Sequence, residues 1–191
     1  ESKFKSTTVL DLLFQAANTN PSKTYCKSAD HEFTYQHFIA ACIKLSRKIS
    51  NKKIKNEKIG ILLPNSILFL ISYFAVLISG NRPALLNYLL PDVALGKLLD
   101  NLEPTLLISN KALIEGNSMI EKIEDYLDIE ASNINGADFR CESSGVGAIL
   151  FSGGTTGIPK QINHSHKCIT SMVYRMEWGW PTKPNEKWLV V

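Results

Sequence analysis

The sequence has few cysteines, no long apolar run and no marked excess of charge of one sign. Its 4 cysteines form no Cys-x-x-Cys pair and have no ligand-like spacing, which argues against a disulfide framework and a cysteine-based zinc site. This cysteine usage predicts a reducing cytoplasm. The most apolar stretch, Ile67–Ile78, is interrupted by Ser72 and falls short of the about 20 residues that span a bilayer, so we predict a buried helix there.

Charge is nearly balanced, since 21 Lys and Arg residues stand against 18 Asp and Glu residues. The resulting net charge of +3 predicts no nucleic-acid partner. One basic cluster lies at the end of a predicted helix and in the loop after it, and we interpret it as a solvated face. Its members are Lys44, Arg47, Lys48, Lys52, Lys53, Lys55 and Lys58.

The two ends of the chain predict a piece of a longer protein. A length of 191 residues is enough for one domain with a sizeable core, and 45% hydrophobic with 20% charged residues excludes disorder of the whole chain. However, the chain begins at Glu1 and stops inside the apolar run 188–191. A run of this kind is typical of the start of a buried strand.

Short apolar strands and longer helices alternate along the sequence. Continuous apolar strands that are separated by helices indicate βαβ units around a parallel sheet buried on both faces. The predicted fold class is therefore α/β, with a mostly parallel sheet flanked by helices in three α/β/α layers. Helices are expected at 7–17, 35–52, 67–79, 92–102, 117–126 and 165–178, and strands at 24–27, 32–34, 58–63, 82–86, 105–109, 146–151 and 161–164.

The residues with the clearest chemistry follow the strand at 146–151. Three glycines within five residues allow consecutive backbone N–H groups to turn toward one anion. Hydroxyl groups add donors and a lysine adds a positive charge, so a strand followed by such a loop predicts a phosphate cradle. The residues are Ser152, Gly153, Gly154, Thr155, Thr156, Gly157 and Lys160. A glycine-rich surface turn is the alternative on composition alone.

Two familiar phosphate loops do not fit this pattern. A Walker A loop needs Gly-Lys-Ser or Gly-Lys-Thr at the start of a helix, whereas Lys160 lies between Pro159 and Gln161 and no helical pattern begins there. A Rossmann fingerprint needs Gly-x-Gly-x-x-Gly, and the glycine spacing differs from it.

The segment from Ser152 to Lys160 resembles the signature loop of the AMP-forming acyl-activating enzymes, which include acyl-CoA synthetases, firefly luciferase and the adenylation domains of peptide synthetases. Segments 60–66, 74–80 and 83–87 are similar to other N-terminal blocks of this family, in the same order. His166 matches a family histidine at the start of a helix. The resemblance covers residues 8–191.

This resemblance implies ATP as a substrate and Mg²⁺ as a cofactor of the full-length protein. A carboxylic acid would attack the α-phosphate of ATP and release pyrophosphate, and a thiol of CoA or of an acyl-carrier protein would then displace AMP. The implied roles are hydroxyl donation to phosphate by Thr155 and Thr156, backbone contacts by the three glycines, and a positive charge from Lys160.

The form of the loop points to a fatty acid as the substrate. Gly153 stands where many members have serine, which looks more like long-chain fatty acyl ligases, and segment 83–88 is similar to synthetases that load fatty acids on carrier proteins. The alternatives are an amino-acid-activating adenylation domain and a non-catalytic nucleotide-binding module that keeps the fold. Gln161 stands where the family has glycine, and this departure predicts a stiffer or bulkier exit from the loop.

The resemblance also implies that much of the active site lies beyond Val191. Residues 1–191 would form the N-terminal part of the large AMP-binding domain, ending soon after the loop at 152–160, with the remainder of that domain and a C-terminal lid domain absent. The family's catalytic lysine and magnesium-binding glutamate have no counterpart here. We expect this piece alone to be inactive and to bind ATP weakly, with any membrane contact peripheral and made through the full-length protein.

Two further groups of residues are assigned to structure. His164 and His166 lack a Cys, Asp or Glu partner at metal spacing, so we predict structural roles for both and no metal site. The tryptophans near the end of the chain, Trp178, Trp180 and Trp188, are expected in the core rather than in a substrate pocket.

Overall fold

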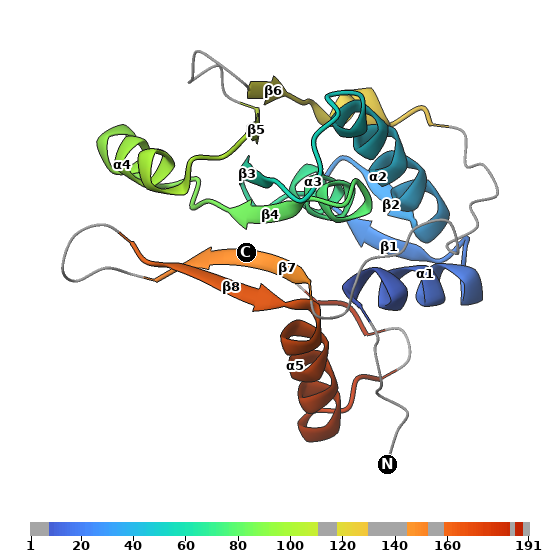
Figure 1. Ribbon diagram of the computed structural model, residues 1–191. Coiled ribbons are helices and arrows are strands. Elements are labelled where there is room, and N and C mark those ends of the chain that lie inside the picture. Colours follow the sequence, from blue (N-terminus) through green and yellow to red (C-terminus); the bar gives the residue numbers. More distant parts are fainter. Residues whose placement is uncertain (1–7, 111–117, 130–144, 153–158, 184–185, 189–191) are drawn as a thin grey trace.

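Helices and strands alternate along the chain, as Figure 1 shows for a computed structural model that describes residues 8–110, 118–129, 145–152, 159–183 and 186–188. The helices of this part are α1 (Val9–Thr19), α2 (Tyr35–Ser50), α3 (Ile67–Ile78), α4 (Asp92–Leu102), α5 (His166–Gly179) and the 3₁₀ helix η1 (Ile123–Tyr126). The strands are β1 (Thr24–Lys27), β2 (Glu32–Thr34), β3 (Lys58–Leu62), β4 (Arg82–Leu85), β5 (Leu106–Ser109), β6 (Ser118–Ile120), β7 (Val146–Phe151) and β8 (Gln161–Ser165).

The main sheet has six strands in the order β6-β5-β3-β4-β7-β8. Strand β3 pairs in parallel with β4 and β5, β5 with β6, and β4 with β7. The last pair, β7 with β8, is antiparallel. The predicted α/β class with a mostly parallel sheet is therefore confirmed. A separate two-stranded antiparallel sheet, β1-β2, confirms the predicted short hairpin.

Helices cover both faces of the sheet. Ile59 and Ile61 of β3 belong to one core cluster, together with buried residues of α1, α2 and α3. A second cluster joins Ala84 of β4 and Ile149 of β7 to the buried leucines of α4. The two clusters lie on opposite faces because side chains alternate along a strand. This gives the three layers expected from the sequence.

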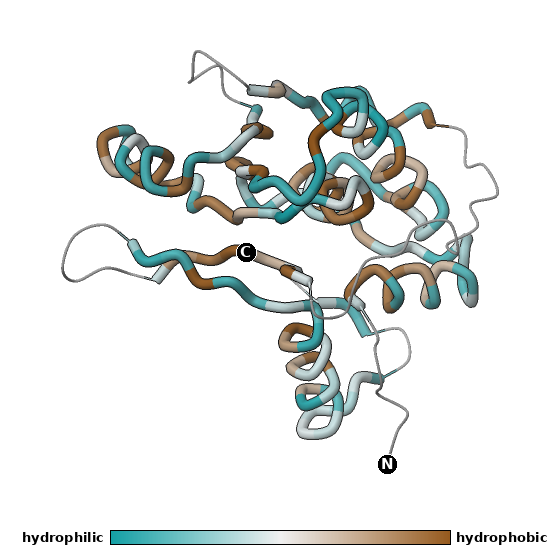
Figure 2. The backbone as a smooth tube through the Cα atoms, viewed as in Figure 1, coloured by the Kyte–Doolittle hydropathy of each residue, from teal (hydrophilic) through white to brown (hydrophobic). Residues whose placement is uncertain are grey.

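Hydroxyl side chains begin four of the helices and satisfy backbone donors of the first turn. Thr8 and Asp11 form a capping box at α1, in which each side chain accepts a backbone N–H of the other residue. Thr34, Ser66 and Ser165 cap α2, α3 and α5. Figure 2 shows polar and apolar residues alternating along α1. This pattern is typical of a helix that buries only one of its sides, as α1 does.

Two predictions about the second half of the chain are wrong. Segment 117–126 was expected to be one helix, but its described part contains β6, which pairs with β5 at the edge of the sheet, followed by η1. The tryptophans are exposed rather than in the core, with exposed fractions of 89% for Trp178, 72% for Trp180 and 59% for Trp188. The buried residues of α5, His166 and Thr170, lie in its first two turns, and the three tryptophans come after this buried part.

Candidate functional site

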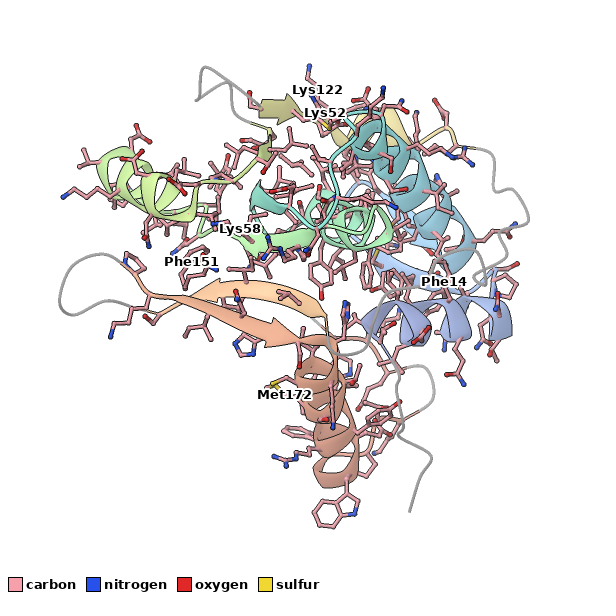
Figure 3. The ribbon with its side chains drawn as sticks, in the orientation of Figure 1. Phe14, Lys52, Lys58, Lys122, Phe151 and Met172 are labelled. Atoms are coloured by element: carbon pink, nitrogen blue, oxygen red, sulfur yellow. The ribbon has the colours of Figure 1, made fainter. Side chains whose placement is uncertain are left out.

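The predicted phosphate loop connects the two strands of a hairpin at the edge of the sheet. Strand β7 runs into the loop and β8 runs out of it, and Phe151 pairs with Gln161 as the last pair of the ladder (Figure 1). The sequence predicted both a strand before the loop and an extended segment after it, and both are confirmed. Figure 3 labels Phe151 at the end of β7, where its side chain packs against the cluster that contains α4.

Ser152 and Lys160 form the neck of this hairpin, where the loop begins and ends. The backbone N–H of Ser152 donates to the carbonyl oxygen of Lys160 over 3.0 Å. The backbone N–H of Lys160 donates to Oγ of Ser152 over 3.2 Å. The structure thus brings the first and last predicted site residues together. The other five, namely Gly153, Gly154, Thr155, Thr156 and Gly157, lie outside the described residues.

The side chain of Lys160 is exposed and makes no hydrogen bond or ion pair with the described part of the chain. Its ammonium group is a strongly hydrated point charge on a flexible stem, which suits the binding of a phosphate group. Gln161, which stands where the family has glycine, does not obstruct the neck. Its Nε2 donates to Oδ1 of Asn163 over 3.1 Å, so the side chain lies along the exposed strand β8.

The other end of the hairpin is fixed to the body of the protein by His166. Its backbone N–H donates to the carbonyl oxygen of Gly145 over 3.0 Å, and its ring Nδ1 accepts the N–H of Val9 over 3.4 Å. His166 is buried, and this burial lowers the pKa of its ring, while the nearby carboxylate of Asp11 acts in the opposite direction. This position agrees with the structural role that the sequence predicted.

Two contacts of β7 hold the hairpin against α3 and α5. The hydroxyl of Tyr73 on α3 donates to the carbonyl oxygen of Gly147 over 3.0 Å. Gly147 also lies so close to α5 that an added Cβ would come within 2.9 Å of Ile169 Cδ1 and 3.2 Å of the backbone nitrogen of His166. No sequence pattern indicates these contacts, since residues 73 and 147 belong to segments far apart in the chain.

The described residues contain no group of three or more His, Cys, Asp or Glu side chains that could hold a metal ion. His164 and His166 point to different neighbours, because Nδ1 of His164 lies 3.8 Å from Sγ of Cys168. None of the described helices combines the length and the hydrophobicity needed to cross a membrane.

Residues 13–191 match the family model described as AMP-binding enzyme. Among curated proteins, the chain is similar to nonribosomal peptide synthetase asaC of Aspergillus flavus, with 25% identity over 83% of this chain and 16% of that protein. It is also similar to nonribosomal peptide synthetase 7 of Gibberella zeae, with 24% identity over 86% of this chain and 4% of that protein. The chain therefore spans a small part of these relatives.

Solved structures also share the fold. The o-succinylbenzoate CoA synthetase MenE of Bacillus subtilis superposes with a TM-score of 0.80 at 16% identity, over 97% of this chain and 50% of that chain. The N-terminal subdomain of NpsA from Klebsiella oxytoca gives a TM-score of 0.71 at 18% identity, over 85% of this chain and 43% of that chain. Because the family model spans nearly the whole sequence, this chain belongs to the AMP-binding enzymes of the adenylate-forming superfamily.

Proposed function

We propose that the chain is the N-terminal part of an adenylation domain that activates an amino acid with ATP, giving an aminoacyl-adenylate and pyrophosphate. The observation that carries this proposal is the similarity to nonribosomal peptide synthetases over more than four fifths of the chain. The chain spans about half of the solved structures that share its fold, which supports residues 1–191 as one part of a larger AMP-binding domain.

The relatives support the amino acid better than the fatty acid that the loop form favoured. The fatty-acid prediction rested mainly on Gly153, which is a single position. These relatives match the chain along most of its length and are named peptide synthetases, and a peptide is built from amino acids. In the second half-reaction of the proposal, the thiol of a carrier protein or of CoA displaces AMP from the adenylate.

Within this proposal the loop binds the β- and γ-phosphates of ATP and orients the leaving pyrophosphate. Lys160 supplies the positive charge, which is exposed and unpaired within the described part of the chain. Thr155 and Thr156 donate their hydroxyls, and Gly153, Gly154 and Gly157 donate backbone N–H groups. The loop would accelerate formation of the adenylate by positioning the phosphates and by stabilising their negative charge. The described residues contain no group of side chains that fits a magnesium site, so we assign no Mg²⁺ ligand among them.

ATP–pyrophosphate exchange tests the proposal. The assay uses the longer protein that contains this chain, with panels of amino, aryl and fatty acids. We expect exchange with one or a few amino acids, and we expect Lys160→Ala to reduce that exchange about 10- to 100-fold because a charge that stabilises the transition state is lost. Lys167→Ala, which removes an exposed lysine of α5, serves as the matched control and should leave exchange unchanged.

Exchange with fatty acids alone would contradict the proposed substrate and support the loop-based prediction. Exchange with none of the acids would support the non-catalytic nucleotide-binding module instead. The isolated 191 residues should show no exchange, because the catalytic lysine of the family has no counterpart in them.

A further inference from the structure

The neck of the β7–β8 hairpin depends on a side chain. In a regular antiparallel ladder, hydrogen-bonded pairs alternate with non-hydrogen-bonded pairs, and in a hydrogen-bonded pair each residue donates its N–H to the backbone carbonyl oxygen of the other. Ser152 keeps one of these bonds, since its N–H donates to the Lys160 carbonyl oxygen. The return bond is different, because the Lys160 N–H donates to Oγ of Ser152. A residue without a hydroxyl at position 152 therefore cannot complete the neck in this form.

The position of the Lys160 backbone is decided at this neck. The residue follows the loop directly and precedes the last ladder pair, Phe151 with Gln161. Its side chain makes no hydrogen bond or ion pair with the described part of the chain that could hold the ammonium group in place. The region that the ammonium group can reach is therefore set by where the backbone of Lys160 lies.

The strength of the attraction between Lys160 and a phosphate depends on this placement. The energy between two charges falls with their separation, so a lysine that starts from a displaced or moving backbone contributes less to anion binding. A lysine on a fixed backbone also loses less freedom when it binds. The hydrogen bond from the Lys160 N–H to the Ser152 hydroxyl therefore affects both the charge attraction and the freedom that is lost on binding.

We propose that Ser152 is a positioning residue that acts through Lys160, and that its hydroxyl serves the neck rather than the phosphate. The inference rests on the proposed function, in which Lys160 binds ATP phosphate. It changes the role expected for Ser152 from the sequence, where its hydroxyl was counted among the donors of the cradle. The competing role is direct donation to phosphate by the same hydroxyl.

Amide hydrogen exchange of Lys160 without nucleotide tests the neck itself. We expect Ser152→Ala to speed exchange of the Lys160 amide about 2- to 10-fold, which corresponds to the loss of one ordinary hydrogen bond. Ser152→Thr keeps the hydroxyl and should restore slow exchange. Ser171→Ala makes the same chemical change at an exposed site on α5 and should leave the Lys160 amide unchanged. Equal exchange in Ser152→Ala and the original protein would overturn the inference.

A double-mutant cycle on ATP affinity separates positioning of Lys160 by the Ser152 hydroxyl from direct contact of that hydroxyl with phosphate. The affinity is measured by calorimetry on the longer protein that contains this chain. We expect Ser152→Ala to weaken ATP binding about 2- to 10-fold when Lys160 is present and less than about 2-fold in the Lys160→Ala background. An equal loss in both backgrounds would show that the hydroxyl contacts phosphate directly, which contradicts the inference. Absence of ATP binding by the original protein would contradict the proposed function, while the amide exchange of Lys160 would still decide the role of Ser152.

Discussion

At the scale of single residues, His166 links protonation to the placement of the hairpin. The residue is only 2% exposed, and its Nδ1 accepts the N–H of Val9, so the neutral ring carries its hydrogen on Nε2. Protonation would add a hydrogen to the accepting nitrogen and place a positive charge in the interior. Burial accordingly holds the pKa of His166 below its ordinary value.

We expect the free energy of unfolding to decrease as the pH falls below about 6.5, because the unfolded chain then binds a proton that the folded chain excludes. The stabilisation that comes from burying neutral His166 is complete above the ordinary pKa of histidine. It is lost as the pH falls toward the lowered pKa of His166 in the folded state. One such proton changes the stability by at most about 1.4 kcal/mol per pH unit. Urea unfolding at pH 7.5 and 5.5 measures it.

His166→Asn is the matched variant for this measurement, since it offers an acceptor oxygen and does not titrate. The original protein should lose more stability than the variant between the two pH values. Parallel losses in both proteins would show that His166 does not contribute to the pH dependence.

Residue types at the candidate site could be read from the sequence, but their contacts could not. The order of glycines, hydroxyl residues and lysine between 152 and 160 is a local pattern that is visible without a structure. The bond between Ser152 and Lys160 depends on the pairing of β7 with β8, and the bond between His166 and Val9 joins residues 157 positions apart. No local pattern indicates such pairs.

At the scale of elements, periodicity predicted most of the fold. The helix at 92–102 and the strand at 146–151 match α4 and β7, and the other confirmed elements agree within about two residues at each end. The failure at 117–126 has a physical reason. Met119, Ile123 and Leu127 have the spacing of an amphipathic helix, but β5 offers an open edge, and the backbone of β6 satisfies its hydrogen bonds there.

The packing of α5 on β7 depends on the missing side chain at Gly147. We expect Gly147→Ala to destabilise the protein by about 1–3 kcal/mol in urea unfolding, because the new methyl group would meet Ile169 and the backbone of His166 and force α5 outward. The backbone contact makes the strain difficult to relieve by a change of rotamer.

Gly96→Ala is a control with the opposite expected sign. Gly96 lies in α4, and an added Cβ would meet no described atom within 4 Å apart from its chain neighbours and the backbone of its own helix. Alanine there should stabilise the protein by up to about 1 kcal/mol through its higher helix propensity. If both substitutions changed the stability equally, the close approach of α5 and β7 would not be the cause.

At the scale of the whole molecule, the outer edge of the sheet is joined to the helical layer by a buried charge. Glu121 follows β6 and is 2% exposed, and its carboxylate accepts a hydrogen bond from the hydroxyl of Tyr126. Nζ of Lys48 on α2 lies 2.8 Å from the same carboxylate. Burial and the neighbouring carboxylate raise the pKa of Tyr126, so its hydroxyl stays protonated and remains a donor. Part of the predicted basic cluster is therefore structural rather than solvated.

Removing Lys48 should weaken this connection strongly, because Glu121 would keep a buried negative charge without its cation. We expect Lys48→Met to lower the free energy of unfolding by about 1–3 kcal/mol in urea at pH 7. The loss is no larger because the side chain of Lys48 is half-exposed. The exposed pair Lys27–Glu32, with a separation of 3.1 Å, provides the comparison, and Lys27→Met should change stability by less than about 0.5 kcal/mol. Equal effects of the two substitutions would mean that burial of Glu121 adds nothing, and the attachment of β6 and η1 would then depend on Tyr126 and apolar packing.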